Sequence, residues 1–227
     1  NHVFFQNREN EEWFVNKNIV SSNRTIIPGS GVNTEYFKLL EYPPDDTINF
    51  LYISRIMKEK GIDEYLEAAS YIREKYPNTM FHVIGFCEED YENKLDDMQR
   101  RGIIKFHGKQ PDVRQFIEFS HCIVHPTYYP EGISNVLLEG AASGRPVITS
   151  NRSGCKEVVD DGINGYLVEQ KNSKHLIDVI EKFLLLDNET RKSMGINGRN
   201  KVVTEFDRRI VVNNYIKQIE KIIKAVN

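Results

Sequence analysis

The chain has 227 residues, of which 40% are hydrophobic and 28% charged, and these proportions are ordinary for a globular protein with a buried core. Its net charge of -3 argues against nucleic-acid binding, which usually needs a basic excess. No apolar run reaches the roughly 18 residues that a membrane span requires. The three cysteines form no zinc-type pattern and favour a reducing, cytoplasmic compartment.

Short apolar strands alternate with amphipathic helices along the chain. We expect a strand at 3–5 and a helix at 9–16, followed by a connector rich in Ser, Asn, Pro and Gly. The expected strands that follow are 48–53, 81–84, 103–106, 122–124, 146–149 and 165–168; the helices between them are 62–76, 91–100, 113–119 and 134–143, with more helices to the end. This alternation predicts an α/β fold, a Rossmann-like doubly wound parallel sheet.

Sheets of this type bind ligands at the carboxyl ends of their strands. Residues 54–61, directly after the strand at 48–53, have the sequence S-R-I-M-K-E-K-G and lack the glycine fingerprint of dinucleotide-binding folds. Arg55 and Lys60 could hold phosphate by side-chain charge instead. The same residues are also compatible with a solvated, charged loop that binds nothing.

The most informative segment is 130–139, with the sequence P-E-G-I-S-N-V-L-L-E. It places Glu131 before a helix start and Glu139 about one turn inside the helix. Free N–H groups at a helix start attract anions. Two carboxylates beside such a site suit a ligand with hydroxyls next to its phosphates, such as a nucleotide sugar. Alternatively, both glutamates are ordinary surface charges.

Other candidate sites have weaker patterns. His121 and His125 share one face of a predicted strand, but no carboxylate follows at ligand spacing, so we favour a non-metal interpretation. Cys155 has no histidine near it in the sequence, and we interpret it as a packing residue. The apolar stripe along 212–226 favours packing against a domain over membrane binding. The missing glycine fingerprint disfavours a nicotinamide dehydrogenase.

Together these residues resemble family-4 retaining glycosyltransferases of the GT-B class. Glu131 and Glu139 match the family's E-x7-E, and residues 55–61 match its R-L-x-x-x-K-G. Segment 27–33 is similar to the hinge into the C-terminal domain, and 154–168 to a later glycine-containing segment of that domain. The sequence departs from the usual residues at three positions, namely Ser54, Gly140 and Cys155.

The resemblance implies a role for each matching residue. Arg55 and Lys60 would hold the diphosphate and neutralise the leaving group, and Glu131 would hold the donor-sugar hydroxyls; these three are the implied catalytic residues. Glu139 would bind the ribose hydroxyls. The remaining implied donor contacts are Gly132, Ile133, Ser134, Asn135 and Val136 at the phosphate, and Lys109 and Gln110 at the base. No metal or other cofactor is implied.

The resemblance also implies a domain organisation for the C-terminal half of a GT-B enzyme. Residues 1–28 would be a remnant of the N-terminal acceptor domain plus the hinge, 29–204 the donor-binding domain, and 205–227 a helix that packs on the missing domain. The full enzyme would transfer a sugar, UDP-linked in our expectation, to a saccharide or lipid-linked acceptor with retention. The isolated fragment would be inactive.

The finer resemblance is to bacterial enzymes of capsule or lipid-linked oligosaccharide synthesis that use UDP-linked N-acetylated sugars. It implies a cytoplasmic protein whose full-length form contacts the inner face of the cell membrane peripherally. Two alternatives stay open: a non-catalytic nucleotide-sugar binding module, and a GT-B UDP-sugar epimerase.

Overall fold

Six parallel strands form the main sheet of the computed structural model, which describes residues 2–226. The strand order is β5-β4-β3-β6-β7-β8, so the direction of winding reverses between β3 and β6. This order confirms the expected doubly wound fold, and the reversal is the point at which such sheets bind ligands. The strands are β3 (Ile48–Ile53), β4 (Thr79–Ile84), β5 (Ile104–Phe106), β6 (Cys122–His125), β7 (Val147–Ser150) and β8 (Gly165–Val168).

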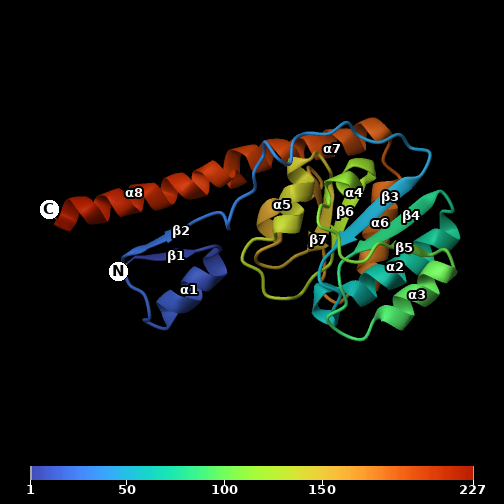
Figure 1. The fold of residues 1–227 in the computed structure, drawn as a ribbon, viewed down its shortest axis with the longest axis horizontal. Coiled ribbons are helices and arrows are strands. Elements are labelled where there is room, and N and C mark those ends of the chain that lie inside the picture. Colours follow the sequence, from blue (N-terminus) through green and yellow to red (C-terminus); the bar gives the residue numbers. More distant parts are fainter. Residues whose placement is uncertain (1, 227) are drawn as a thin grey trace.

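Helices cover both faces of this sheet (Figure 1). Apolar side chains of α2, α3 and α6 form one buried cluster against it, and those of α4 and α5 form a second cluster on the opposite face. The helices are α2 (Ile62–Lys75), α3 (Glu92–Arg100), α4 (Arg114–Phe119), α5 (Asn135–Ala142), α6 (Ser173–Leu184) and α7 (Asn188–Lys201); single turns occupy Lys58–Lys60 and Lys156–Val158, and a π-helical turn occupies Val202–Phe206.

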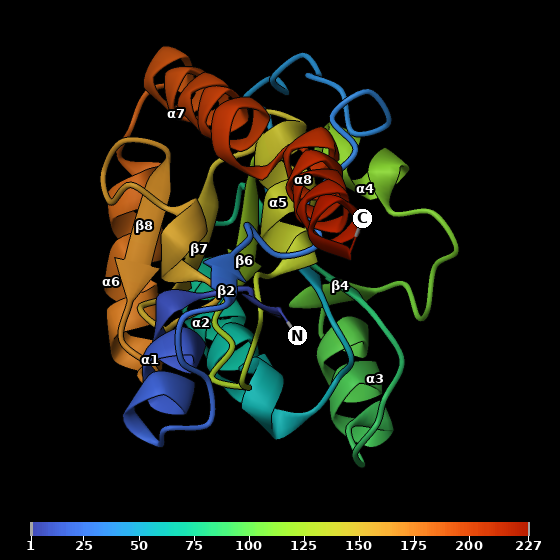
Figure 2. The ribbon, with the colours of Figure 1, turned by 90° about the vertical axis from the view of Figure 1, so that its left-hand side faces the viewer.

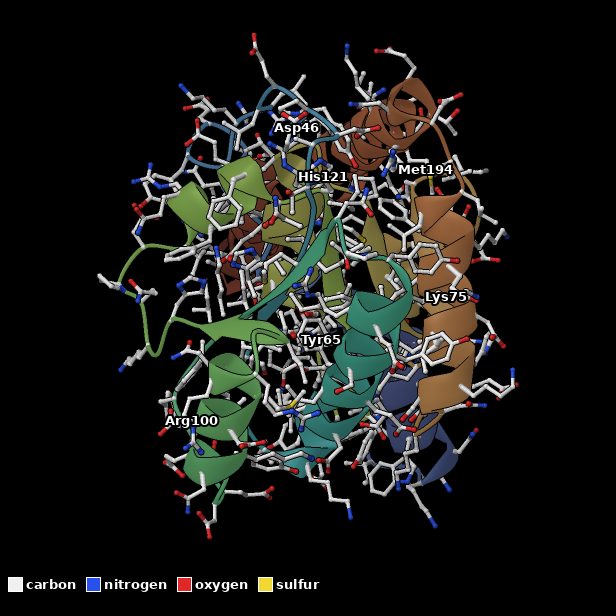
Figure 3. The ribbon with its side chains drawn as sticks, turned by 90° about the vertical axis from the view of Figure 1, so that its right-hand side faces the viewer. Asp46, Tyr65, Lys75, Arg100, His121 and Met194 are labelled. Carbon is white, nitrogen blue, oxygen red and sulfur yellow. The ribbon has the colours of Figure 1, made fainter. Side chains whose placement is uncertain are left out.

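Buried tyrosines connect the core to the edge of the sheet. Tyr65 lies between α2 and the sheet (Figure 3), where its hydroxyl donates to the carbonyls of Phe50 and His82 at 3.0 and 2.9 Å. Tyr52 donates in the same way to the Lys60 carbonyl, at 3.1 Å. The turn that carries Lys60 is therefore attached to the rigid centre of the domain.

The N-terminal residues form a separate unit. Strand β1 (Val3–Phe5), helix α1 (Arg8–Asn16) and strand β2 (Arg24–Ile26) make a two-stranded parallel sheet that is not part of the six-stranded one. Strand β2 lies in the segment expected to be an irregular connector, so that expectation was wrong. This strand is only three residues long and is held by pairing with β1, 21 residues earlier in the chain. Such long-range pairing leaves no pattern in the local sequence.

The last helix, α8 (Arg208–Val226), extends away from the main body (Figures 1 and 2). Its side chain Tyr215 contacts Phe4 of β1, with ring centroids 4.4 Å apart. Val211 of α8 is buried, but most large apolar side chains further along the helix are exposed, namely Val212, Tyr215, Ile216, Ile219, Ile222 and Ile223. None of the helices within residues 2–226 combines the length and apolarity needed to cross a membrane.

Candidate functional site

The loops that follow β3 and β6 meet at the point where the winding reverses. The carbonyl oxygen of Glu59, in the first loop, accepts three hydrogen bonds from the second: from Thr127 Oγ1 at 3.2 Å and from the N–H groups of Tyr128 and Tyr129, each at 2.9 Å. A carbonyl oxygen has two lone pairs, so three donors saturate it. This contact holds the loop of Lys60 against the loop of Glu131.

Gly61 permits this close approach. Its φ of +75° lies in the left-handed region, and a Cβ added there would overlap the carbonyl oxygen of Pro126. Any other residue would suffer both backbone strain and a steric clash at this position. The glycine that ends the R-x-x-x-x-K-G segment is therefore required by the contact between the two loops.

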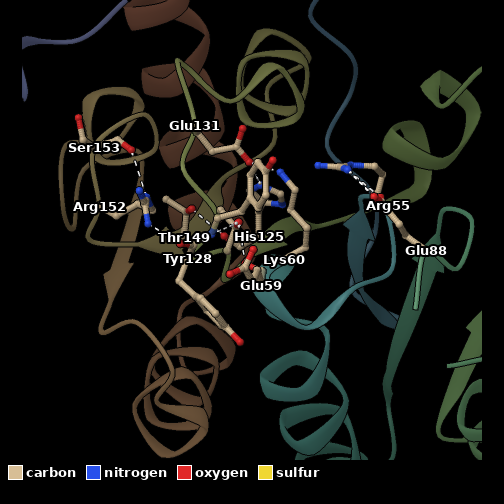
Figure 4. A network of polar contacts seen from close by, with 12 residues as sticks. Arg55, Glu59, Lys60, Glu88, His125, Tyr128, Glu131, Thr149, Arg152 and Ser153 are labelled. Atoms are coloured by element: carbon tan, nitrogen blue, oxygen red, sulfur yellow. Dashed lines mark hydrogen bonds and ion pairs between the residues drawn. The ribbon is translucent and has the colours of Figure 1, made fainter. Parts of the chain in front are cut away.

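Lys60 and Glu131 form an ion pair across these loops (Figure 4). The pair is largely buried, with side-chain exposures of 9% and 18%. Burial opposes ionisation of Glu131, but neighbouring His125 and Lys60 hold the pKa of this carboxyl below its usual value. Two of the residues expected to bind the donor are thus brought together, and each now neutralises the other.

Arg55 lies on the exposed side of the same site and pairs with Glu88 in the loop after β4 (Figure 4). Its Nη1 atom donates to both carboxylate oxygens, at 2.9 and 2.7 Å. The ring of Tyr129 lies between the two expected phosphate-binding cations, 5.2 Å from the Arg55 guanidinium carbon and 4.5 Å from Lys60 Nζ. Tyr129 and Glu88 are site residues that the sequence interpretation missed.

Helix α5 begins at Asn135, with Ser134 as its N-cap, and the Ser134 side chain makes no capping hydrogen bond. The Ser134 N–H, one of the amides expected to meet phosphate, donates to the Gly154 carbonyl at 2.8 Å in this structure. Within residues 2–226, the N–H groups of Asn135 and Val136 have no hydrogen-bond partner. They leave a partial positive charge at the start of the helix.

Gly154 packs closely against the Glu131 loop at the start of this helix. A Cβ at this position would lie 2.7 Å from the Cβ of Glu131, and the φ of +91° also requires glycine. Its N–H donates to the carboxylate of Glu157 at 2.8 Å. Glu157, which its position in the sequence suggested as a minor candidate near the ligand edge, therefore supports the Glu131 loop indirectly.

Glu139 lies one turn inside α5, as the sequence predicts. Its carboxylate is half-buried, and it has no ion pair or hydrogen bond with any residue from 2 to 226. Burial alone raises its pKa from 4.5 to about 7. We expected a packed carboxylate to have a partner; within the described residues the protein supplies none, so its acceptor capacity is free for a ligand.

Lys109 and Gln110 lie on the other side of the site, in the loop after β5. Gln110 Nε2 donates to the His107 carbonyl at 2.5 Å, which fixes the loop. Lys109 Nζ lies 5.6 Å from the centroid of Phe86, an exposed ring in the loop after β4. Neither residue has a hydrogen bond or an ion pair with Glu131 or Lys60.

His125 is the last residue of β6, one residue beyond the predicted strand, and lies beside Glu131 (Figure 4). Its Nε2 atom is 3.9 Å from Glu131 Oε1, and burial lowers its pKa below the usual value. No group of three or more metal-binding side chains occurs within residues 2–226. Cys155 is fully buried and its pKa is raised to about 12, which agrees with a packing role.

A cleft of about 850 Å³ lies between the N-terminal unit and the main domain, and Arg55, Lys60, Glu131 and Glu139 are not among its lining residues. Polar residues of β1–α1 line one side, and Ser153, Lys156 and Glu157 the other. At its edge, Asn7 Nδ2 donates to the carbonyls of Glu131 and Gly132, each at 3.3 Å. The N-terminal unit therefore contacts the Glu131 loop directly.

Comparison with known families identifies the chain. The model of the family described as "Glycosyl transferases group 1" matches residues 37–201, the part that carries Arg55, Lys60, Glu131 and Glu139. This match covers most of the chain, and the protein belongs to that family.

Two curated relatives are bacterial. The capsular polysaccharide biosynthesis glycosyltransferase CapM of Staphylococcus aureus is 29% identical, over 91% of this chain and 56% of its own length. The N,N'-diacetylbacillosaminyl-diphospho-undecaprenol alpha-1,3-N-acetylgalactosaminyltransferase of Campylobacter jejuni is 24% identical, over 98% and 61% respectively. The chain thus spans little more than half the length of these relatives.

Solved structures share the fold. A glycosyltransferase from Rickettsia africae superposes with a TM-score of 0.87 at 20% identity, covering 98% of this chain and 64% of that one. HepE from Anabaena, solved in complex with UDP-glucose, superposes with a TM-score of 0.82 at 20% identity, covering 97% and 64%. These likenesses show the fold: the main sheet is the Rossmann-like domain of the GT-B architecture.

Proposed function

We propose that the edge between β3 and β6 binds a nucleoside-diphosphate sugar. The observation that carries the proposal is the contact between Lys60 and Glu131 across the reversal point, beside the uncapped start of α5. In this assignment Arg55, Lys60 and the first amides of α5 bind the diphosphate. Glu131 binds the hydroxyls of the donor sugar, and Glu139 accepts hydrogen bonds from the ribose.

The reaction we propose is glycosyl transfer with retention. The bond between the anomeric carbon and the phosphate oxygen breaks, and its electron pair stays on the diphosphate. The acceptor hydroxyl attacks from the same face and gives its proton to a phosphate oxygen. Arg55, Lys60 and the helix start stabilise the growing negative charge, and removing one such preorganised donor typically slows a reaction about 10²–10³-fold. This route uses no metal ion or cofactor.

For the donor we propose a UDP-linked sugar, and for the acceptor a saccharide or a lipid-linked saccharide. HepE is described in complex with UDP-glucose, and the name of the Campylobacter relative specifies a diphospho-undecaprenol compound. These descriptions support the proposal by relationship. A reaction at the inner face of the cell membrane, with peripheral contact of the whole protein, would follow from a lipid-linked acceptor.

We further propose that the chain is the donor-binding part of a larger enzyme, with 1–28 from the acceptor domain, 29–204 as the donor domain and 205–227 packed on the acceptor domain. The separate sheet of β1 and β2 and the exposed apolar face of α8 support this organisation. On this basis the chain alone binds the donor and transfers little or no sugar.

Calorimetric titration with UDP, GDP and ADP tests donor binding. We expect UDP to bind, and we expect Arg55→Ala and Glu139→Ala each to weaken binding about tenfold or more, because each removes a charge-assisted hydrogen bond. Arg100→Ala, at an exposed side chain of α3, is the matched control and should bind like the wild type. Unchanged affinity in both site variants would remove the assignment.

Two further measurements separate the proposal from its alternatives. Incubation with a UDP-sugar in the absence of acceptor should leave the sugar unchanged; conversion to an epimer would identify an epimerase. With the acceptor domain restored, NMR of the product should show the donor's anomeric configuration. An inverted product would refute retention, and absence of any transfer would favour a non-catalytic binding module.

A further inference from the structure

The two ring nitrogens of His125 are buried and lack hydrogen-bond partners. The side chain is 2% exposed, and neither Nδ1 nor Nε2 lies within hydrogen-bond range of a partner among residues 2–226. Buried polar atoms of this kind carry the full cost of desolvation and are uncommon in folded proteins. An apolar residue would fill the same space without that cost, so the imidazole calls for an explanation beyond packing.

The nearest acidic oxygen is Glu131 Oε1, 3.9 Å from His125 Nε2. That distance exceeds a hydrogen bond by roughly 1 Å. Lys60 currently holds the same carboxylate oxygen. The imidazole thus lies just outside the range at which it would replace Lys60 as the partner of Glu131.

The histidine is held in place while Glu131 lies on a loop. The His125 carbonyl accepts a hydrogen bond from Thr149 Oγ1 at 2.7 Å, and the two residues pair in neighbouring strands β6 and β7. The ring of Tyr52 lies near the imidazole, with the two ring centroids 6.4 Å apart and the ring planes tilted by 42°. A small displacement of the Glu131 side chain is therefore sufficient to close the gap.

Binding of a diphosphate creates the need for such a partner. Lys60 then faces an anion with more charge than one carboxylate, and the ammonium moves toward it. Glu131, only 18% exposed, would be left as a buried charge without a donor, which is costly. His125 is the adjacent donor with no other bond to give up.

We propose that His125 is a positioning residue for Glu131, which exchanges Lys60 for the His125 Nε2–H when a nucleoside diphosphate draws Lys60 away. The inference rests on the proposed function. After the exchange, one carboxylate oxygen accepts the imidazole hydrogen bond and the other faces the donor sugar. His125 does not touch the substrate; it orients the carboxylate that does.

Calorimetry on two variants tests the exchange. The first probe is UDP. The second is a sugar nucleotide: whichever of UDP-glucose, UDP-N-acetylglucosamine and UDP-N-acetylgalactosamine binds the wild type most tightly. In His125→Phe, the affinity for UDP should stay within about twofold of the wild type. The ratio of the affinity for the sugar nucleotide to the affinity for UDP should fall about tenfold or more, which is the size expected for one hydrogen bond to a charged group. His125→Gln, which keeps a terminal N–H donor, should recover most of this loss.

Thermal unfolding distinguishes positioning from a structural role. His125→Phe should melt at the same temperature as the wild type or higher, because it removes two unpaired buried nitrogens. A structural histidine would lower the melting temperature. If His125→Phe prefers the sugar nucleotide over UDP by the same factor as the wild type, the inference is wrong and the proposed function still stands.

Nitrogen NMR of the labelled histidines gives a direct readout with UDP alone. Saturating UDP should shift the His125 Nε2 resonance in the wild type, and Glu131→Ala should abolish the shift. If UDP binds and the resonance does not move, the inference is wrong and the donor site remains. If UDP does not bind at all, the inference and the proposed function fail together.

Discussion

Two cation–carboxylate pairs at the carboxyl edge of the sheet differ in burial. Lys60 and Glu131 have side-chain exposures of 9% and 18%, whereas Arg55 and Glu88 have 36% and 41%. Removing one partner from a buried pair leaves an uncompensated charge, but exposed pairs contribute little to stability. Folding and ligand binding are therefore coupled at Lys60, whereas Arg55 can exchange Glu88 for a ligand at almost no cost to the fold.

The largest expected effect, on stability and binding together, comes from Lys60→Ala. It leaves the buried Glu131 carboxylate with no cation and only the neutral His125 imidazole as a donor, so the free energy of unfolding should fall by about 2 kcal/mol, and UDP binding should be lost. Urea unfolding and calorimetry measure the two effects. The double variant Lys60→Met with Glu131→Gln should recover most of the stability and none of the binding. A single variant as stable as the wild type would contradict the role of burial.

A second prediction concerns the contact that holds the buried pair together. Gly61→Ala should lower the free energy of unfolding by about 2–3 kcal/mol, because backbone strain adds to overlap with Pro126. Gly102→Ala is the matched control: its φ of +70° is similar, but a Cβ there meets no atom within 4 Å. Gly102→Ala should lower the free energy of unfolding by about 1 kcal/mol, the cost of the backbone strain alone. If both variants lose the same free energy of unfolding, the overlap with Pro126 does not affect stability.

The third prediction extends the comparison to Glu139, a half-buried carboxylate with no cation among the described residues. Its pKa is raised from 4.5 to about 7, so between these values the folded state keeps a proton that the unfolded chain releases, and stability falls as pH rises through this range. Glu139→Gln should therefore stabilise the protein at pH 8 by about 1–2 kcal/mol and have little effect at pH 4.5. Urea unfolding at both pH values measures this; a pH-independent difference would contradict it.

The smallest effect is expected at the exposed pair. Glu88→Gln should change the free energy of unfolding by less than about 0.5 kcal/mol, since pairs of this exposure are weak. It frees Arg55, so UDP should bind up to about threefold more tightly. Glu189→Gln, an exposed residue of α7, controls for the lost charge. Weaker UDP binding in Glu88→Gln would mean that Glu88 supports the site.

The fold was largely predictable because local patterns and strand order agree. The strands at 48–53 and 165–168 match the expected ranges, and their apolar composition alone suffices to identify them. Strand β2 was missed because its three residues are set by long-range pairing. Which helix covers which face follows from right-handed crossovers once the strands are placed.

The site was predictable only in part. The fold brings the loops after β3 and β6 together, so the meeting of Lys60 and Glu131 follows from the strand order. The partner of Arg55 did not follow, because Glu88 lies in an irregular loop whose path no periodicity describes. His125 was considered only as a metal ligand, and its lack of hydrogen-bond partners depends on packing that a sequence does not display.

The carbonyl of Glu59 has a consequence for anyone who redesigns this protein. Three donors converge on a main-chain oxygen, so no side-chain replacement at position 59 deletes the acceptor. Libraries that vary the exposed positions around Arg55 can therefore alter ligand preference while the junction between the two loops persists. Mutational tolerance at Glu59 should be high even though its backbone occupies the centre of the site.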